Sequence, residues 1–253
     1  MINNKRVIVV LPAYNAAKTL RKIYYEIPKD AIDGIILVDD SSNDETVSIA
    51  KDLKITTFVH PRNLGYGANQ KTCYERALKA GADIVVMLHP DYQYDPKLVN
   101  PMAGLIASET FDIVLGSRIL GGMAVKMGMP VYKYIANRCL TFIQNIFLDK
   151  KLSEYHTGLR AFSKDALLKI PLLENSDDFL FDNEMLVQAI YFGYKIGEIT
   201  SWCRYNSESS SIGFKRSIFY GLGVISNCIK FKLQKLRLAN FSIFNPAGRK
   251  YYI

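Results

Sequence analysis

The chain has 253 residues, of which 49% are hydrophobic and 22% are charged, and its formal net charge is +8. This composition excludes a disordered chain and a bundle of membrane-spanning helices, and it predicts one large α/β domain, alone or with a short appendage. The basic balance favours an anionic partner, such as a nucleic acid, an anionic membrane or a phosphate-bearing substrate. The four cysteines are far apart, which predicts reduced thiols of a cytosolic protein and neither a disulfide framework nor a CxxC metal site.

In the first half of the chain, short apolar runs alternate with helical patterns. Strands are expected over residues 7–11, 35–38, 55–59, 84–88 and 113–115. Helices are expected between them, over residues 16–27, 44–53, 67–80 and 95–108. Nearly continuous apolar strands that alternate with helices are typical of a doubly wound, mostly parallel sheet that is covered on both faces.

The second half of the chain has a less regular pattern. A long helix is expected over Val131–Leu148, a short strand or turn over residues 157–162, a helix over Phe181–Tyr191 and a strand over residues 196–199. A polar loop follows, from residue 204 to residue 211. Because no internal repeat and no low-complexity linker is present, we expect one domain over residues 1–210 and a tail over residues 211–253.

Polar residues follow four of the expected strands. The clusters are Pro12-Ala13-Tyr14-Asn15, residues 39–44, residues 89–93 and residues 116–118. Ligands of doubly wound sheets bind beyond the carboxyl ends of the strands. The four clusters are therefore expected to converge on one cleft.

Asp91 and Gln93 are two residues apart at the end of an apolar strand. In an extended segment such residues point the same way, so two oxygen-bearing side chains would face one point in the cleft. Hard divalent cations prefer oxygen ligands and keep positions open for phosphate oxygens, and such an ion neutralises a diphosphate leaving group. The alternative is a surface turn, because residues 91–96 are rich in turn formers.

Asp39 and Asp40 stand at the tip of the second expected strand. A carboxylate there can accept hydrogen bonds from a nucleotide base or a ribose. The alternative is that these residues begin the helix that follows, and both interpretations hold together if the cap and the ligand use different acids.

Taken together, these motifs resemble the inverting glycosyltransferase family 2. Residues 11–15 and 38–46 resemble the opening of that family, and residues 63–69 resemble its glycine-rich segment. Residues 116–118 and 157–162 resemble the polyprenyl-phosphate branch, whose members are similar to dolichol-phosphate-mannose synthase. The resemblance covers residues 5–210 and implies a GT-A fold, which is an α/β sheet that binds the nucleotide together with an acceptor-side region.

The resemblance implies a nucleotide-sugar donor, with UDP favoured over GDP, and Mg²⁺ or Mn²⁺ bound by Asp91 and Gln93. It also implies which residues hold the nucleotide sugar. These are Pro12, Ala13, Tyr14, Asn15, Asp39, Asp40, Asn63, Gly67, Asn69 and Asp91.

The metal motif departs from the family pattern at one position. The family usually has Asp-x-Asp, whereas this chain has His89-Pro90-Asp91. A neutral imidazole ligates Mn²⁺ better than Mg²⁺. His89 is therefore either a third ligand or, as we favour, a residue behind Asp91 and Gln93. A second departure is Glu154, where the branch often has aspartate.

The acceptor decides which residues carry the transfer. A hydroxyl acceptor needs a base, and by family position the base is Glu184, with Asp182 nearby. The alternative is that Glu184 is an exposed helix acid. A lipid phosphate is already anionic and instead needs cations that position it. The candidates for phosphate contacts are Arg118, Lys133, Arg138, Arg160 and Arg204.

The tail combines an apolar helical stripe with lysine and arginine, and no acidic residue lies between Ser211 and Leu238. Basic amphipathic helices bind anionic membrane surfaces. The alternative is a helix packed on the core, and because Gly221 and Gly223 weaken a helix, two short helices are a further alternative. No signal peptide and no membrane-spanning stretch is evident, so we expect a cytoplasmic protein at the inner face of the membrane.

Three functions remain open from the sequence. The first is transfer of a sugar to polyprenyl phosphate, and the second is transfer to a hydroxyl of a surface polysaccharide or another glycan. The third is a non-catalytic nucleotide-sugar-binding module or membrane scaffold. Nucleic-acid binding is not expected, because the charge follows the apolar stripe and no recognised motif is present. The sequence leaves open whether the chain forms a homo-oligomer.

Overall fold

The apolar runs of the sequence form one seven-stranded sheet in the computed structural model, which describes residues 1–204 and 213–253. The strands are β1 (Val7–Ala13), β2 (Gly34–Asp39), β3 (Thr56–Val59), β4 (Ile84–Met87), β5 (Ile113–Ser117), β6 (Arg160–Ser163) and β7 (Ile196–Thr200). Every residue of β1, β4 and β5 is buried, as expected for strands that are covered on both faces.

The strand order is β3-β2-β1-β4-β6-β5-β7. The neighbouring pairs are parallel except at β6, which runs antiparallel to both β4 and β5. The expected mostly parallel, doubly wound sheet is therefore confirmed, with β6 as its exception. Arg160, the first residue of β6, pairs with Met87 of β4 and with Leu115 of β5, so it enters the sheet at the carboxyl end of its neighbours.

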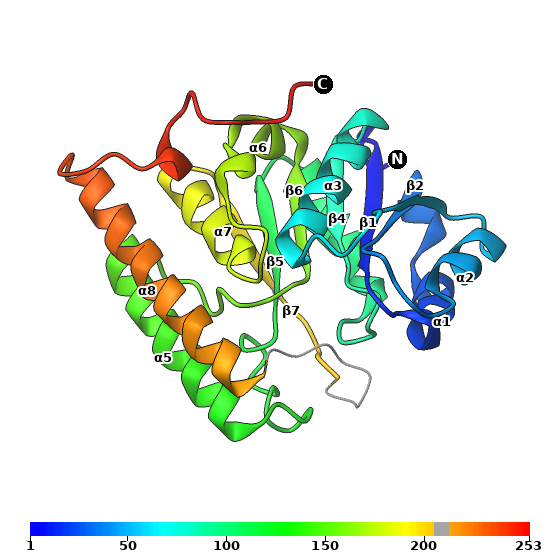
Figure 1. The fold of residues 1–253 in the computed structure, drawn as a ribbon, viewed down its shortest axis with the longest axis horizontal. Helices are drawn as coiled ribbons and strands as arrows, with labels where there is room; N and C mark the ends of the chain where they lie inside the picture. The colour runs from blue at the N-terminus through cyan, green and yellow to red at the C-terminus, as the bar shows by residue number, and fades with distance from the viewer. Residues whose placement is uncertain (205–212) are drawn as a thin grey trace.

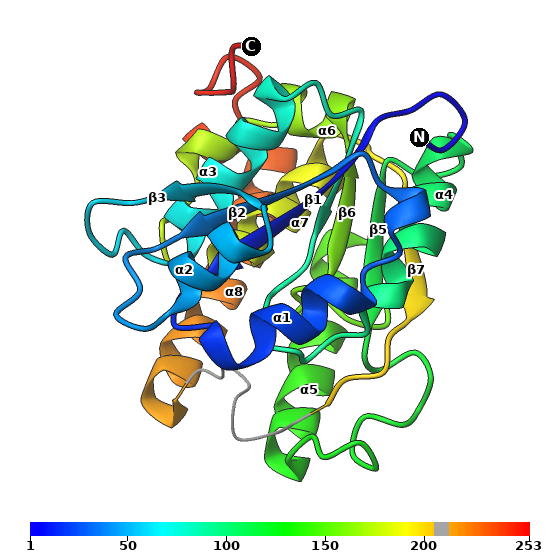
Figure 2. The ribbon, with the colours of Figure 1, turned by 90° about the vertical axis from the view of Figure 1, so that its right-hand side faces the viewer.

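Helices cover both faces of the sheet (Figures 1 and 2). Residues of three helices share one apolar core with the sheet: α1 (Ala17–Glu26), α2 (Thr46–Asp52) and α4 (Val99–Ala107). Residues of five helices share the other core: α3 (Tyr66–Lys79), α5 (Val131–Leu148), α6 (Lys164–Lys169), α7 (Phe181–Tyr191) and α8 (Phe214–Lys235). Short 3₁₀ turns complete the chain at η1 (Lys29–Ala31), η2 (Pro96–Leu98), η3 (Leu172–Glu174) and η4 (Ser242–Phe244).

The long helix α5 (Val131–Leu148) lies side by side with α8 (Figure 1). The alternative of two short helices in the tail is wrong, because α8 is continuous over 22 residues. Close packing explains one of its two glycines. A Cβ at Gly223 would lie 2.9 Å from Leu180 Cδ1, whereas a Cβ at Gly221 would lie at an ordinary contact distance of 3.9 Å from Leu140 Cδ1. The packing at Gly223 thus offsets the roughly 1 kcal/mol that a glycine costs within a helix.

Three further expectations concern the cysteines, membrane-spanning helices and the polar loop after β7. None of Cys73, Cys139, Cys203 and Cys228 forms a disulfide, and Cys139 alone among them is exposed. Among the residues that the structure describes, no helix has both the length and the apolar character that a bilayer crossing requires. The expected polar loop lies outside the described residues except for Arg204.

Candidate active site

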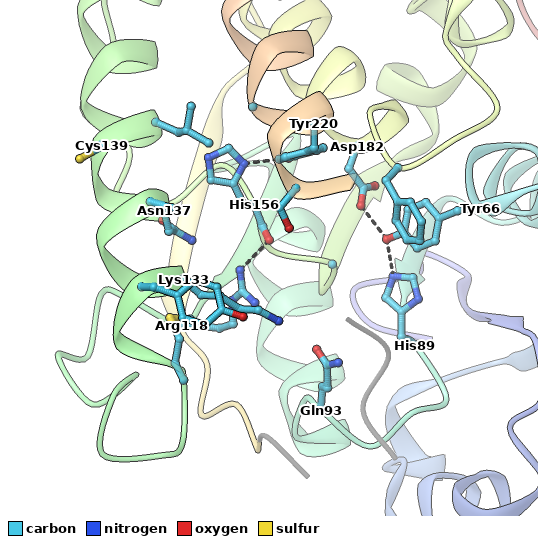
Figure 3. A pocket seen from close by; sticks show the side chains of 18 of the residues that line it. Tyr66, His89, Gln93, Arg118, Lys133, Asn137, Cys139, His156, Asp182 and Tyr220 are labelled. Atoms are coloured by element: carbon cyan, nitrogen blue, oxygen red, sulfur yellow. Dashed lines mark hydrogen bonds between the residues drawn. The ribbon is translucent and has the colours of Figure 1, made fainter. Parts of the chain in front are cut away.

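A cavity of about 510 Å³ opens beyond the end of β4, between the sheet and the first halves of α5 and α8 (Figure 3). Its lining brings together six of the residues that the sequence predicts for the metal, the base and the acceptor. These are His89, Asp91, Gln93, Arg118, Lys133 and Asp182. Two of the four predicted strand-end clusters, residues 89–93 and 116–118, thus contribute to this cavity, whereas no residue of the clusters 12–15 and 39–44 is part of its described lining.

The turn after β4 positions Asp91 and Gln93. Tyr92 between them has a φ of 61°, so the chain reverses there and both neighbours line the cavity. Asp91 Oδ1 accepts the backbone N–H of Gln93 at 3.1 Å, which fixes the carboxylate on the turn. The Tyr92 hydroxyl donates to Glu26 at 2.6 Å, and this hydrogen bond anchors the turn to α1. The surface-turn alternative therefore holds for the backbone, while the two side chains face the cavity.

Arg204, in the segment after β7, contacts the same turn. Its backbone N–H donates to the Gln93 carbonyl at 2.9 Å, and its guanidinium carbon lies 4.7 Å from the centre of the Tyr92 ring. Arg204 is exposed, and it is not one of the described residues that line the cavity. Its place therefore connects the segment after β7 to the predicted metal site.

His89 is buried against Tyr66, with the two rings stacked at 5.4 Å. The Tyr66 hydroxyl donates to Asp182 at 2.7 Å, so His89 Nε2, at 3.1 Å from the same oxygen, must carry a hydrogen and donate it. Burial lowers the pKa of His89 and keeps the ring neutral. The ring therefore has its lone pair at Nδ1, which has no partner among the described residues.

The glycine of the Thr157–Phe162 motif makes room for this ring. A Cβ on Gly158 would lie 2.8 Å from a carbon of the His89 ring, which is closer than real contacts permit. The Gly158 N–H also donates to the hydroxyl of Tyr94 at 2.8 Å. The motif before β6 and the histidine in the metal motif are therefore one packing unit.

Of the two acids on α7, Asp182 faces the cavity and Glu184 does not. Asp182 accepts hydrogen bonds from Tyr66 at 2.7 Å and from Gln70 at 3.0 Å. Glu184 is buried instead, and its carboxylate accepts the backbone N–H of Ser176 at 2.7 Å. The alternative of Glu184 as an exposed helix acid is thus wrong, and the position that can act on an acceptor is Asp182.

Arg118 is bound along one wall of the cavity by Glu154. Its backbone N–H and its Nε donate to the Glu154 carboxylate at 2.7 and 2.8 Å, and Asn137 Nδ2 donates to the same carboxylate at 2.8 Å. Glu154 is fully buried. Burial opposes ionisation, but the charge and hydrogen bonds of Arg118 outweigh it and lower the pKa of Glu154. Arg118 thus brings to the cavity a guanidinium whose charge is largely balanced.

The remaining candidate cations have different surroundings. Lys133 lines the cavity from α5, and no carboxylate within the described ranges pairs with it. Arg138 is exposed and donates to the Ser153 carbonyl at 2.9 Å. Arg160 is fully buried and donates to the carbonyls of Thr157, at 2.8 Å, and Tyr155, at 3.1 Å. The structure thus gives Arg160 a packing role within the sheet, and it places Lys133 in the cavity lining beside the paired Arg118.

The predicted nucleotide residues lie along the neighbouring carboxyl ends of β1 and β2. Asp39 is buried and accepts the Ser42 backbone N–H at 2.8 Å. Asn15 interlocks with the same turn, since its N–H donates to Ser42 Oγ at 2.8 Å and its Oδ1 accepts from Asn43 at 2.9 Å. Tyr14 is half exposed at the end of β1. These contacts fix the loop over which a nucleotide would lie.

Asp40 organises the glycine-rich segment instead. Its carboxylate accepts from the backbone N–H groups of Leu64 and Gly65 at 2.9 and 3.0 Å, and it lies 2.8 Å from His60 Nδ1. Within that segment Asn63 is exposed.

The helix that follows is held by two further predicted residues. Asn69 donates to the Ala13 carbonyl at 3.3 Å and so ties α3 to the end of β1. A Cβ on Gly67 would lie 2.6 Å from the Ser176 carbonyl, so only glycine fits there.

The residues at the end of β4 fit a divalent ion that shares its ligands with a diphosphate. Asp91 and Gln93 offer oxygen donors and His89 Nδ1 offers a nitrogen. Among the described residues no three histidine, cysteine, aspartate or glutamate side chains are grouped to hold a metal by themselves. Mg²⁺ commonly relies on one or two carboxylates together with substrate phosphates, so this sparse donor set is consistent with such a site.

Sequence reasoning missed several residues of the cavity. Tyr66, Tyr94, His156, Phe179 and Tyr220 all line it. Their partners are distant in the sequence: Tyr66 pairs with Asp182, and His156 pairs with Tyr220. Such pairs leave no periodic pattern, and the position of Tyr66 inside the glycine-rich segment was the one available signal.

A doubly wound sheet with carboxylate and amide oxygens after β4 and a cavity beside them is the arrangement of the GT-A fold that the motifs imply. The sequence matches the family model Glycosyl transferase family 2 over residues 8–170. The chain therefore belongs to glycosyltransferase family 2, as its motifs predicted, and it is an enzyme of that class.

Two archaeal relatives illustrate the branch. The chain is 29% identical over 242 residues to the UDP-N-acetylglucosamine–dolichyl-phosphate N-acetylglucosaminyltransferase of Methanococcus voltae, which covers 87% of this chain and 95% of that protein. It is also 29% identical over 189 residues to the low-salt glycan biosynthesis hexosyltransferase Agl6 of Haloferax volcanii, covering 72% of this chain and 43% of that protein.

The fold has solved counterparts. Glucosyl-3-phosphoglycerate synthase from Mycobacterium tuberculosis, in complex with UDP, matches with a TM-score of 0.69 at 18% identity, over 90% of this chain and 80% of that one. The same enzyme with Mn²⁺, UDP-glucose and phosphoglyceric acid matches with a TM-score of 0.67. At this identity the likeness supports the fold.

Proposed function

We propose that the protein transfers a sugar from a nucleotide-sugar donor, with UDP favoured, to a polyprenyl-phosphate lipid at a membrane surface. The observation that carries this proposal is the composition of the cavity. At one end it has Asp91 and Gln93, and at the other it lies between α5 and α8, with Lys133 and apolar side chains in its wall. A diphosphate leaving group suits the first end, and a phosphate on an apolar chain suits the second.

The donor is assigned from the residues at the ends of β1, β2 and β4. The predicted nucleotide loop and the metal motif are neighbours in the sheet, because β1 pairs with both β2 and β4. A divalent ion held by Asp91 and Gln93, with Mg²⁺ or Mn²⁺ as the candidates, would neutralise the charge on the departing diphosphate. The Methanococcus voltae relative is named for a UDP-sugar donor, which supports UDP here.

A lipid phosphate accounts for the acceptor side of the cavity. An anionic phosphate oxygen would attack the anomeric carbon as the bond to the diphosphate breaks, which releases the nucleoside diphosphate and inverts the configuration. No proton has to be removed from such an acceptor, so Lys133 and Arg118 would position it. The name of the Methanococcus voltae relative includes a dolichyl-phosphate acceptor, which is a polyprenyl phosphate of the same class.

The paired helices α5 and α8 supply the surface through which we propose that the enzyme contacts the membrane. Neither helix contains an acidic residue. Together they expose large apolar side chains, namely Val131, Tyr132, Ile135, Phe142, Ile146, Ile218, Phe219, Leu222 and Ile229. Apolar groups combined with lysine and arginine bind anionic lipid surfaces.

The membrane contact is tested by sedimentation with vesicles of phosphatidylglycerol or of phosphatidylcholine. Binding to the anionic vesicles should fall in the double variant Phe219→Glu and Leu222→Glu but not in Tyr25→Glu, which changes an exposed aromatic residue on α1. Equal binding by all three proteins would contradict the proposed surface.

The transfer itself is tested by nucleotide release from the purified protein. A panel of UDP- and GDP-sugars is supplied with Mn²⁺ or Mg²⁺, with and without a short-chain polyprenyl phosphate. We expect release that needs both the lipid and the Asp91 carboxylate. Asp91→Asn should lower the rate by about a hundredfold or more, whereas Asp52→Asn, which removes an exposed carboxylate on α2, should not change it. No release under any combination would refute the proposal and favour a non-catalytic role.

A hydroxyl acceptor on a glycan is the second candidate function, and one observation favours it. Asp182 faces the cavity and is held in place by Tyr66 and Gln70, as a base would have to be. Release without lipid but with a saccharide, abolished by Asp182→Asn, would select this candidate. If the acceptor is a lipid phosphate, Asp182→Asn should have a much smaller effect on the rate.

A further inference from the structure

A chain of buried amide side chains connects three helices behind the cavity. Asn227 of α8 donates through Nδ2 to Asn183 Oδ1 of α7 at 3.1 Å. Asn183 in turn donates through Nδ2 to Gln144 Oε1 of α5. All three residues are fully buried. Because each amide has a separate donor and acceptor atom, these bonds give the chain one direction, from α8 towards α5.

The chain continues to His156 and fixes its tautomer. With its oxygen bonded to Asn183, Gln144 presents Nε2, which lies 3.3 Å from His156 Nε2. An N–H donor there requires an unprotonated His156 Nε2. Burial lowers the pKa of His156 to about 4, so at neutral pH the ring is uncharged and carries its single hydrogen on Nδ1.

Tyr220 is the last member of the chain and belongs to the cavity wall (Figure 3). His156 Nδ1 lies 2.8 Å from the Tyr220 hydroxyl oxygen and donates to it. The hydroxyl hydrogen of Tyr220 therefore takes no part in the bond to His156, and none of the described residues accepts it. Burial raises the pKa of Tyr220, so this hydrogen is retained at neutral pH.

We propose that Tyr220 donates its hydroxyl hydrogen to the phosphate of the acceptor, and that Asn227, Asn183, Gln144 and His156 hold it in that donor orientation. This inference rests on the proposed phosphate acceptor. Tyr220 is then a binding residue, and the other four are positioning residues that act through it. A hydrogen bond to an ionised group contributes more than one between neutral groups, so the orientation of one hydroxyl has a measurable effect.

Reversal of the chain shows why the tautomer matters. If His156 carried its hydrogen on Nε2, its Nδ1 would be an acceptor and would take the Tyr220 hydrogen for itself. The tyrosine would then offer the cavity only its oxygen, which repels an anionic phosphate. In cooperative chains of hydrogen bonds each member polarises the next. A change at Gln144 is therefore expected to alter the orientation of the Tyr220 hydroxyl, which is two hydrogen bonds away.

One variant and one control test whether Tyr220 donates a hydrogen bond to the phosphate. Binding of farnesyl phosphate is titrated without any sugar donor, beside farnesol, inorganic phosphate and 3-phosphoglycerate as separate arms. We expect Tyr220→Phe to weaken farnesyl phosphate binding about ten- to hundredfold and to leave farnesol unaffected. Tyr191→Phe, which alters a tyrosine packed on Phe231 of α8 away from the cavity, should bind as the wild-type protein does. Farnesyl phosphate binding within twofold of wild type for Tyr220→Phe would overturn the proposal.

The positioning role is tested by a double-mutant cycle and by the tautomer itself. Gln144→Met removes the donor to His156 but keeps the shape, and it should weaken farnesyl phosphate binding while adding nothing in the Tyr220→Phe background. Nitrogen-15 NMR should find His156, one of three histidines in the chain, with its hydrogen on Nδ1. An additive effect in the cycle or an Nε2–H tautomer would overturn the positioning role.

These measurements separate the inference from the proposed function. A wild-type protein that binds farnesyl phosphate but transfers no sugar to it refutes the proposed function, while Tyr220 remains a hydrogen-bond donor to the bound phosphate. A wild-type protein that transfers sugar to farnesyl phosphate, with equal binding by Tyr220→Phe, refutes the inference alone. Tighter binding of 3-phosphoglycerate than of farnesyl phosphate would indicate that Tyr220 donates to a small phosphorylated acceptor. That result would overturn the lipid acceptor in both the proposed function and this inference.

Discussion

Replacing Glu154 by glutamine is expected to destabilise the protein by about 3 kcal/mol, because the change leaves the charge of Arg118 without its buried partner. Glu154 is fully buried and the Arg118 side chain is 12% exposed. The carboxylate accepts three hydrogen bonds from Arg118, from its backbone N–H at 2.7 Å, from Nε at 2.8 Å and from Nη2, and one from Asn137 at 2.8 Å. Glutamine has the same shape but only one acceptor oxygen, and its NH₂ group would face the N–H groups of Arg118.

The loss is measured by urea unfolding followed by circular dichroism, with Asp52→Asn as the matched control. Asp52 pairs with Arg21 at 2.8 Å, but both side chains are at least half exposed, so that pair contributes about 0–1 kcal/mol. In thermal unfolding, a 3 kcal/mol loss corresponds to a fall in the midpoint of about 6–12 °C for a chain of this size. The reasoning is refuted if Glu154→Gln costs no more than Asp52→Asn.

The pH dependence of the same variant gives an independent test. The pKa of Glu154 is lowered in the folded protein, so the stabilisation from its charge is fully present above the unfolded pKa of about 4.3 and is lost as the pH falls through the folded value. The difference in unfolding free energy between the wild-type protein and Glu154→Gln should therefore shrink below about pH 4.3. A difference that stays constant into acid would contradict the ion pair as its cause.

Three further predictions follow from the cavity. Gly158→Ala should cost about 1–3 kcal/mol in urea unfolding, because its Cβ would lie 2.8 Å from the His89 ring, whereas Gly104→Ala, where a Cβ would meet no atom within 4 Å, should cost nothing. Alkylation by N-ethylmaleimide should occur first at Cys139, which lines the cavity and is exposed, and should block acceptor binding in the wild-type protein but not in Cys139→Ser. The thermal midpoint should fall as the pH drops from about 6.5 to about 4, because the unfolded chain then binds a proton that buried His156 resists, and His156→Gln should flatten that part of the profile.

Arg118 and Lys133 have different surroundings at the same cavity. Arg118 is paired with a buried carboxylate, so it offers a guanidinium edge of small net charge. Lys133 comes from α5 and pairs with no carboxylate in the described ranges. Under the proposed function, the flexible four-carbon stem of a lysine beside a paired arginine suits an anionic acceptor whose apolar chain is held elsewhere.

Much of the fold could be predicted from the sequence because its signals are local. The apolar β-branched runs identified the strands, and the helices Val131–Leu148 and Phe181–Tyr191 have the bounds that their patterns predict. The position of Asp91 and Gln93 just after an apolar strand was enough to predict that both face one cleft, but the predicted reason was wrong, because a turn at Tyr92 with a φ of 61°, and not an extended segment, brings them there. The family resemblance added the GT-A fold and the glycosyltransferase class from motifs that are each only a few residues long.

The tertiary structure alone decided which of these residues meet. Asp182 and Glu184 are about 200° apart on a helix, so only one can face the cavity, and the packing of α7 against α3 selects Asp182. Arg160 looks like a phosphate ligand in the sequence, but β6 enters antiparallel between β4 and β5 and buries it. Arg118 pairs with Glu154 36 residues away, and His156 pairs with Tyr220 64 residues away. Contacts over such separations depend on how the elements pack, and no periodicity or motif in the chain encodes them.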